Sequence, residues 1–374
     1  MARQAVISGA NKPLRIETYN VPPVPPNLVR IKVAYGGICH TDLHLREDNG
    51  VSFGVKLRDV YGEDKFNSMV MGHEVAGYVD DIGSESNADQ LGLKKGDRVA
   101  VYPWMGCQSC GACGIEKPNL CSSEMPLLHF MGMGPNIKGG YGSHVIVPPK
   151  FLVKVPQNIS LDVASILTCS GGTVLSALKK LEETVQFGVD TSESGVAKLL
   201  IVGAGGLGLW AVKLAKVMFK GKVHVMVAEI DQKKIDLAKE YGADEGILWS
   251  RNKMDENIAA ALKGGKMHGI IDLIGSTMTL MTNSKILGRN GRMVVVGVQG
   301  GEVGVQISDV VNTGNAIVGS IVFTLAEMQE VVDLVSKNNI TYPNIRHFTL
   351  DAVNEALELL EKGQISGRAV LKYE

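Results

Sequence analysis

Four cysteines stand close enough in the sequence to bind one metal ion. Cys107, Cys110, Cys113 and Cys121 have the spacing C-x2-C-x2-C-x7-C and are four of the six cysteines in the chain. Four thiolates so spaced can close a tetrahedral Zn²⁺ site with no open position, and such an ion staples a loop and does no chemistry. Four unrelated free thiols are one alternative. The other is a zinc ribbon that binds nucleic acid, which would have a longer spacer and flanking basic residues, and neither is present.

A glycine-rich turn indicates a second site. The segment Gly203-Ala204-Gly205-Gly206-Leu207-Gly208 follows the apolar run 199–202 and precedes a helical pattern. Between a strand and a helix, the first glycine permits a tight turn, the second lets a pyrophosphate approach the backbone, and the third packs the helix on the strand. The N–H groups at the helix start attract the phosphates. The alternative is a glycine-rich turn that binds nothing.

The choice of dinucleotide depends on the acid that follows the second apolar run. Glu229 lies 21 residues beyond Gly208, where a carboxylate accepts hydrogen bonds from the adenosine ribose and repels a 2′-phosphate. This favours NAD over NADP. Asp231 is a rival for the role, but its place before Gln232-Lys233-Lys234 suits a helix N-cap better.

Cys39, His73 and Cys169 form a third, dispersed group. Two thiolates and one imidazole would suit a catalytic zinc, which keeps an open position for water or substrate. No periodicity connects these three residues, so spacing alone leaves other interpretations open. The alternatives are that the histidine is a core residue with its hydrogen bonds made inside the protein, and that the cysteines only pack in the core.

The elements that must position these residues fall into two kinds. The first third has short alternating runs such as Val29–Val33 and frequent turn residues, typical of irregular β structure. From about Ser170, apolar runs alternate with helical patterns, which predicts a parallel sheet. We therefore predict an α/β protein with an irregular β-rich domain (1–170 and 321–374, including a zinc lobe at about 105–122) and a doubly wound, six-stranded Rossmann domain (171–320). Its expected strands are Lys198–Val202, Val223–Ala228, Gly246–Trp249, Gly269–Leu273, Gly291–Val296 and Ala316–Ile321.

Composition excludes several classes of protein. The chain has 374 residues, a formal net charge of −1, 45% hydrophobic and 21% charged residues. The sequence has no basic stripe of the kind that binds nucleic acid, so we expect no nucleic-acid partner. The N-terminus has no apolar signal segment, and no apolar run approaches the roughly 20 residues that span a bilayer, so we expect a cytoplasmic protein without a membrane partner.

Taken together, these motifs resemble the zinc-containing medium-chain dehydrogenase/reductase family, the alcohol dehydrogenases, over essentially the whole chain. The cysteine spacing matches the family's structural-zinc loop. The family's zinc signature is matched by Gly72-His73-Glu74-x2-Gly77-x5-Gly83-x2-Ser86. Further family counterparts are Gly96-Asp97-Arg98-Val99, Gly139-Gly140-Tyr141 and the closing segment Gly363 to Leu371.

The resemblance implies a GroES-like catalytic domain and roles for individual residues. Cys39, His73 and Cys169 would be catalytic zinc ligands, with Glu74 able to reach the metal and Asp42 orienting a ligand. Thr41 would take the substrate proton and His44 would deliver it to water, although a solvated surface histidine is the alternative for His44. For NAD, the resemblance implies His40 at the pyrophosphate and Thr173 near the nicotinamide, with Gly275, Gly297 and Val298 on the cofactor edge of the sheet.

The expected function is zinc-dependent interconversion of an alcohol and an aldehyde or ketone by hydride transfer to NAD. The alternatives are an NADP-dependent aldehyde reductase and a non-catalytic zinc-binding or nucleic-acid-binding protein. The segment 46–68 is longer than the family's and is expected to form a surface loop near the substrate mouth. The short segment after Cys121 favours a homo-oligomer, a tetramer rather than a dimer. Met125, Met131 and Met133 could line a pocket or simply fill gaps.

Overall fold

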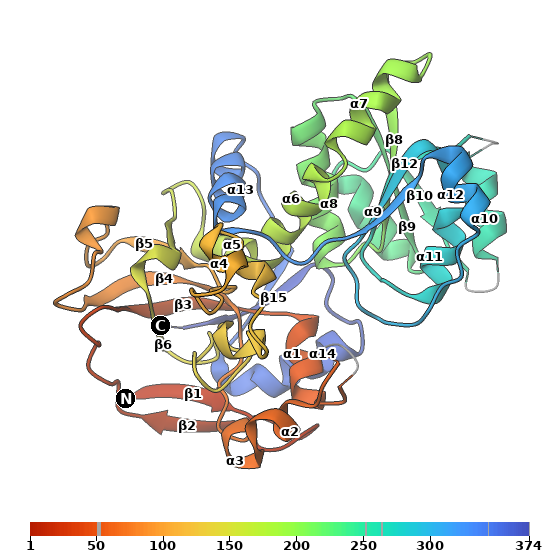
Figure 1. Ribbon diagram of the computed structural model, residues 1–374. Helices are drawn as coiled ribbons and strands as arrows, with labels where there is room; N and C mark the ends of the chain where they lie inside the picture. Colours follow the sequence, from red (N-terminus) through yellow and green to blue (C-terminus); the bar gives the residue numbers. More distant parts are fainter. Residues whose placement is uncertain (51–53, 251–252, 263–264, 343, 374) are drawn as a thin grey trace. The chain divides into compact units, whose positions relative to one another are not determined.

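The computed structural model describes residues 1–50, 54–250, 253–262, 265–342 and 344–373. The chain divides into two compact units, called here unit 1 (Met1–Gly172 with Thr324–Glu374) and unit 2 (Thr173–Phe323). The helices and strands of both are labelled in Figure 1.

Unit 1 is built on a mixed, largely antiparallel sheet. Its strand order is β14-β15-β3-β4-β5-β7, and β6 pairs with β3 outside that path. The strand β15, close to the C-terminus, lies antiparallel to β3, so the early and the late segment of unit 1 share one sheet. The strands are β3 (Val29–Ile38), β4 (Glu74–Ile82), β5 (Arg98–Val101), β6 (His144–Val147), β7 (Leu152–Lys154), β14 (Ile345–Phe348) and β15 (Arg368–Lys372).

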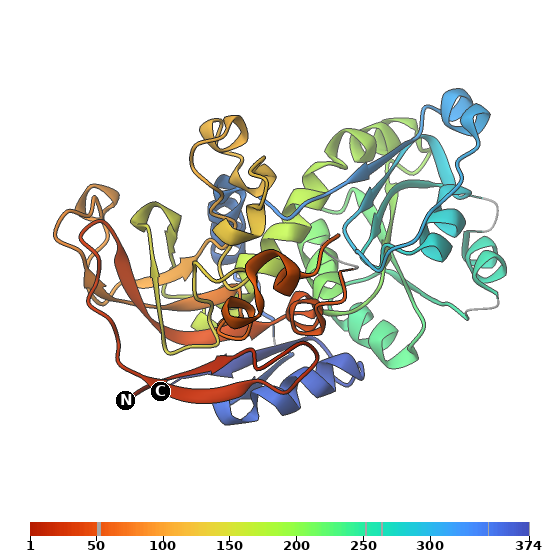
Figure 2. The same ribbon diagram turned by 60° about the horizontal axis from the view of Figure 1, so that its bottom comes forward.

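A separate two-stranded ribbon, β1 (Ala2–Val6) and β2 (Arg15–Tyr19), runs beside α14 (Val353–Glu361), as Figure 2 shows. The Leu14 amide donates to Asn354 Oδ1 at 2.7 Å across this contact. The other α-helices of unit 1 are α1 (His40–Glu47), α2 (Leu57–Tyr61), α3 (Glu63–Phe66), α4 (Gly111–Gly114), α5 (Leu161–Ile166) and α13 (Leu325–Lys337). The 3₁₀ turns are Asp89–Leu91, Pro118–Leu120, Pro126–His129, Pro149–Phe151 and Leu350–Ala352.

Unit 2 is the expected doubly wound domain. Its six strands are all parallel in the order β10-β9-β8-β11-β12-β13, and consecutive residues of the central strand β8 are buried, so both faces of the sheet are covered. The strands are β8 (Ala197–Val202), β9 (Val223–Glu229), β10 (Glu245–Leu248), β11 (Met267–Asp272), β12 (Leu287–Val295) and β13 (Ala316–Gly319). The helices are α6 (Gly172–Lys179, which begins at the unit boundary), α7 (Glu182–Thr191), α8 (Gly206–Phe219), α9 (Gln232–Glu240), α10 (Met254–Leu262), α11 (Thr277–Ser284) and α12 (Ile307–Thr313).

Two expectations about the chain need correction. A continuous helix, Leu161–Lys179, has 19 residues and a mean hydropathy of 1.5, so one apolar segment does reach membrane-spanning length. Because 94% of its apolar window is buried inside the protein, it is a core helix. The segment 46–68 is not a plain loop either, since it contains α2 and α3, and its residues 51–53 lie outside the described part.

Candidate metal and dinucleotide sites

The four cysteines at 107–121, called here the cysteine lobe, lie together around α4. All their sulfur atoms are within 4.8 Å of one another, and Cys110 Sγ lies 3.9 Å from Cys121 Sγ. Zinc–sulfur bonds of about 2.3 Å in a tetrahedron separate the sulfurs by about 3.8 Å, so the observed spacing fits zinc. Backbone N–H groups lower the pKa of Cys110 to about 5, whereas burial raises that of Cys113 to about 12. At Gly106, with φ +66°, a Cβ would lie 2.7 Å from Cys113 Sγ, so the turn needs glycine.

The second group, called here the buried set, consists of Cys39, His73, Glu74 and Cys169. One ligand atom from each lies within 4.8 Å of the others, and all four residues are buried. Cys39 directly follows β3, His73 directly precedes the neighbouring strand β4, and Glu74 is the first residue of β4. Cys169 lies in a π-helical turn, Leu167–Gly171, within the long core helix. The π turn is a local departure from α-helix of the kind often found at functional sites.

The donors of the buried set also fit zinc. His73 Nε2 is 3.3 Å from Cys169 Sγ, close to the roughly 3.6 Å separation expected for an imidazole and a thiolate on one zinc ion. A hydrogen bond from Cys169 and the nearby imidazole hold the pKa of Cys39 well below its usual range, and the same bond, with burial, raises that of Cys169. Burial lowers the pKa of His73, but the neighbouring Asp42 carboxylate and Cys39 thiolate outweigh it and raise the pKa overall.

Glu74 faces this group with a carboxylate that is only half satisfied. Its Oε1 pairs with the buried Arg368, while its buried Oε2 has no hydrogen-bond partner among the described residues. Burial raises the pKa of Glu74 to about 7. A Cβ on Gly37 would lie 1.9 Å from Oε2, so glycine makes the space for the carboxylate. A cation bound at this point would offset the free-energy cost of burying the thiolate and carboxylate charges.

The residues expected to move a proton lie on α1, which begins directly after Cys39. Thr41 Oγ1 is 3.7 Å from Cys39 Sγ, and His44 follows one helical turn later with its Nδ1 3.8 Å from Glu47 Oε2. Thr41 and His44 are half-buried, and His40 is exposed at the start of the helix. Thr41, beside the buried set, and His44, one turn farther along, are therefore both partly open to solvent.

The glycine-rich turn has the geometry that its pattern predicts. Gly203 has φ +98°, a Cβ on Gly208 would lie 2.1 Å from the Gly203 carbonyl oxygen, and Gly205 faces open space. Glu229 holds the turn, since its Oε2 accepts from the Ala204 amide at 2.9 Å. Asp231 accepts from the Lys233 amide at 2.9 Å, which confirms its role as the N-cap of α9.

The later cofactor candidates lie in two loops packed on each other. A Cβ on Gly275 would lie 1.8 Å from the Gly297 carbonyl oxygen, and the buried Asp272 accepts from the Gly275 amide at 3.0 Å. Both glycines are thus required by backbone packing, whatever they bind. Val298 is exposed, and Thr173 is buried with no hydrogen-bond partner for its hydroxyl among the described residues.

Other residues near the buried set carried no role in the sequence analysis. Arg368 and Tyr141 lie in motifs that the sequence analysis named without assigning them a function, and Tyr141 donates to Asp42 at 3.0 Å. The Trp104 ring lies 5.4 Å from that of His73, with Phe130 edge-on against Trp104. The three methionines named in the sequence analysis differ in exposure, since Met131 and Met133 are buried and Met125 is exposed.

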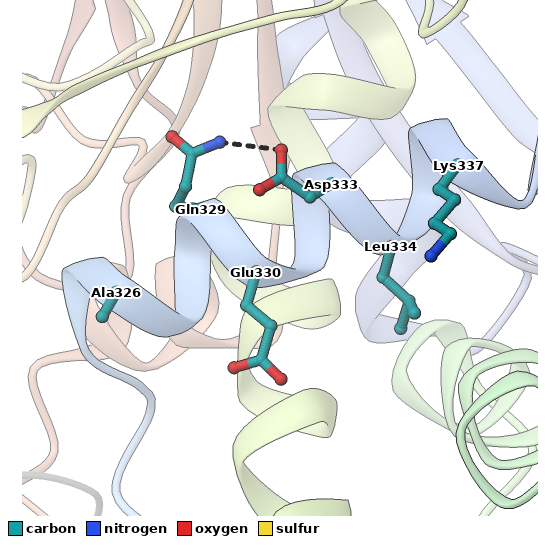
Figure 3. Close-up of a pocket in the computed structure, with 6 residues that line it drawn as sticks. All are labelled: Ala326, Gln329, Glu330, Asp333, Leu334 and Lys337. Atoms are coloured by element: carbon teal, nitrogen blue, oxygen red, sulfur yellow. Dashed lines mark hydrogen bonds between the residues drawn. The ribbon is translucent and has the colours of Figure 1, made fainter.

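The surface depression in Figure 3 is lined by other residues. It is lined by the side chains of α13 alone, and Gln329 donates to Asp333 within it at 2.9 Å. Its lining residues are Ala326, Gln329, Glu330, Asp333, Leu334 and Lys337. None of the candidate site residues contributes to it.

Comparison with known proteins gives a consistent result. The family model described as "Alcohol dehydrogenase GroES-like domain" matches residues 25–157, and "Zinc-binding dehydrogenase" matches 206–337. A NAD-dependent alcohol dehydrogenase of Sulfolobus acidocaldarius is 33% identical over 96% of both chains, and an alcohol dehydrogenase of Geobacillus stearothermophilus is 30% identical over 99% of this chain and 98% of its own. The crystal structure of the Aeropyrum pernix alcohol dehydrogenase superposes with a TM-score of 0.82, at 30% identity, over 99% of this chain and 100% of that one.

Proposed function

Because the chain belongs to the zinc-type medium-chain alcohol dehydrogenase family, we propose that it oxidises a small-molecule alcohol with NAD at a zinc ion held by Cys39, His73 and Cys169. The reverse reaction reduces the corresponding aldehyde or ketone. The observation that carries this proposal is the buried set itself, with two thiols, an imidazole and a partly unsatisfied carboxylate converging on one point. We assign the structural role to a second zinc ion in the cysteine lobe, whose four thiols leave no open position.

When bound, zinc acts as a Lewis acid that lowers the pKa of the alcohol, and the nicotinamide accepts the hydride. The chain's own residues carry the substrate proton to solvent and bind the cofactor. Thr41 accepts the hydroxyl proton of the substrate, and His44, farther along α1, releases it to solvent. Glu229 and the turn 203–208 bind the adenosine ribose and the pyrophosphate, while His40, Thr173, Gly275, Gly297 and Val298 complete the cofactor site.

On this proposal, residues 1–170 and 321–374 form the catalytic domain and residues 171–320 bind NAD. The protein works in the cytoplasm as a homo-oligomer, with a tetramer favoured. Exposed apolar side chains on α12 and on the edge strand β13 support assembly, because an unpaired strand edge beside an apolar helix invites a second copy. They include Ile307, Val310, Val311 and Ile317.

A panel of primary, secondary and aromatic alcohols and their aldehydes, assayed with NAD(H) and NADP(H), tests the function. We expect turnover with NAD(H) that is lost on zinc removal, and about two zinc ions per chain by elemental analysis. A preference for NADP would favour the aldehyde-reductase alternative, against the carboxylate at Glu229. No oxidation or reduction across the panel by the two-zinc protein would overturn the proposal.

A further inference from the structure

Asp42 is the point at which three distant segments meet beside the buried set. Its Oδ2 accepts from the Cys39 amide at 2.9 Å and from the Tyr141 hydroxyl at 3.0 Å. Its Oδ1 lies 3.6 Å from His73 Nδ1, opposite the Nε2 that faces Cys169. Asp42, His73 and Tyr141 are all buried, so water does not compete for these contacts.

Tyr141 is itself held against the segment that carries His73. Its amide donates to the Met71 carbonyl at 2.9 Å, and its carbonyl accepts from the Ala5 amide at 2.8 Å. Its ring occupies the space beside Gly72, where a Cβ would lie 2.5 Å from a ring carbon. Gly72 has φ +95°, so glycine at this position permits both the turn and the ring. The tyrosine therefore has little freedom to move away from Asp42.

The hydroxyl of Tyr141 determines which way the Asp42 carboxylate can turn. With both donors in place, Oδ2 is fixed between Cys39 and Tyr141, and Oδ1 has to face the imidazole. A metal-binding histidine is oriented by the acceptor at its other ring nitrogen. If the hydroxyl is removed, one of the two donors that hold Oδ2 is lost and the carboxylate can rotate away from His73.

We infer that Tyr141 is a positioning residue for the metal site, which acts through Asp42 to orient His73 and the backbone at Cys39. This inference rests on the proposed function, because it requires a metal ion in the buried set. It predicts that removal of one buried hydroxyl changes the metal environment of the buried set and leaves the cysteine lobe unchanged.

The test compares Tyr141→Phe with Asp42→Asn, the double variant and a matched control, Tyr102→Phe, which alters another fully buried tyrosine that packs on Phe151. Each protein is loaded with Co²⁺, and the d–d absorption bands, metal affinity and melting temperature are measured. We expect Tyr141→Phe to weaken Co²⁺ binding at the buried set about tenfold, the lower end of the range for residues behind a metal ligand, and to shift the bands of that site while those of the cysteine lobe stay unchanged. The control should match the wild type.

The double variant should resemble Asp42→Asn alone, because the tyrosine acts only through that carboxylate. Unchanged spectra and affinity in Tyr141→Phe would overturn the inference. So would an unchanged spectrum in Asp42→Asn, a result that holds even if Tyr141→Phe fails to fold. Failure of the proposed function is a different outcome, in which the wild-type protein itself binds only the metal ion of the lobe.

Discussion

The cysteine lobe and the buried set differ in how the chain assembles them. The lobe takes its four thiols from 15 consecutive residues, and all four are half-buried. The buried set takes its residues from the position just after β3, from the first residue of β4 and the one before it, and from a π-helical turn, so more than 90 residues separate His73 from Cys169. The buried set also lies among buried charged and polar side chains, namely Asp42, Tyr141 and Arg368.

This difference indicates what each group can do. Four thiolates satisfy a zinc ion completely, so a closed site contributes to folding and not to reaction. The buried set offers three strong donors, and its fourth member, Glu74, already pairs with Arg368. On the proposed function, a zinc ion held by the other three would keep one position open for a substrate. The predictions below ask whether the two groups separate in this way.

The largest expected effect is on turnover. His73→Asn should remove one zinc ion per chain and lower kcat/KM by about 10³-fold or more, because Lewis-acid stabilisation is worth several kcal/mol at roughly 1.4 kcal/mol per factor of ten. Steady-state kinetics and elemental analysis measure both changes. His144→Asn, which alters a half-buried histidine on β6, is the control. Retention of both zinc ions by His73→Asn would mean that His73 is not a ligand.

Cys110→Ser should act on stability instead. Loss of the lobe's zinc ion should lower the melting temperature, by roughly 6–12 °C if the ion contributes about 3 kcal/mol to unit 1. Turnover per folded chain at low temperature should stay near the wild-type value. Ser109→Ala, which removes a hydroxyl 3.4 Å from Cys107 Sγ but no thiol, is the control. If the Cys110→Ser protein were fully folded but inactive, the assignment of a structural role to the lobe and a catalytic role to the buried set would be contradicted.

Thiol reactivity should differ about tenfold or more in protein stripped of metal by a chelator. Thiolates react and thiols do not, so at pH 6 Cys110, with its pKa lowered to about 5, should be alkylated first, ahead of Cys113, with its pKa of about 12. Cys39 and Cys169 should react last, because they are buried. Peptide mapping after a pulse of iodoacetamide measures the order. Denatured protein gives the reference rates. If Cys39 were labelled as fast as Cys110, the predicted difference in exposure between the buried set and the lobe would be wrong.

Smaller effects on turnover than that of His73→Asn are expected along α1, since on the proposed function the buried set needs an outlet for a proton and the lobe does not. Thr41→Ala should lower alcohol oxidation by about 10²-fold, the lower end for a general acid–base group. His44→Gln should lower it severalfold at neutral pH, with recovery at higher pH, because water can replace an outer relay group. Both variants should keep two zinc ions. If His44→Gln left the rate and the pH profile unchanged, His44 would have no part in proton release and would be only a surface residue.

Much of this architecture is predictable from local sequence patterns. The six strands of unit 2, the glycine turn and the N-cap at Asp231 depend on residues close together in the chain, where geometry is set by turns and hydrogen bonds of short span. The core helix Leu161–Lys179 is not evident in the sequence because its apolar residues are interrupted by polar ones such as Ser165, Thr168 and Ser170, whose hydroxyls donate to carbonyl groups of the same helix.

The sequence by itself therefore determined the cysteine lobe, the two kinds of domain and the acid at the end of the second strand of unit 2, since each depends on spacing along the chain. Only the tertiary structure decided what surrounds His73. The pairing of β3 with β4 brings Glu74 opposite Gly37, and β15 brings Arg368 to Glu74 from 294 residues away. Tyr141 reaches Asp42 across 99 residues. Such contacts follow from the packing of segments, and no local period in the sequence encodes which segments pack together.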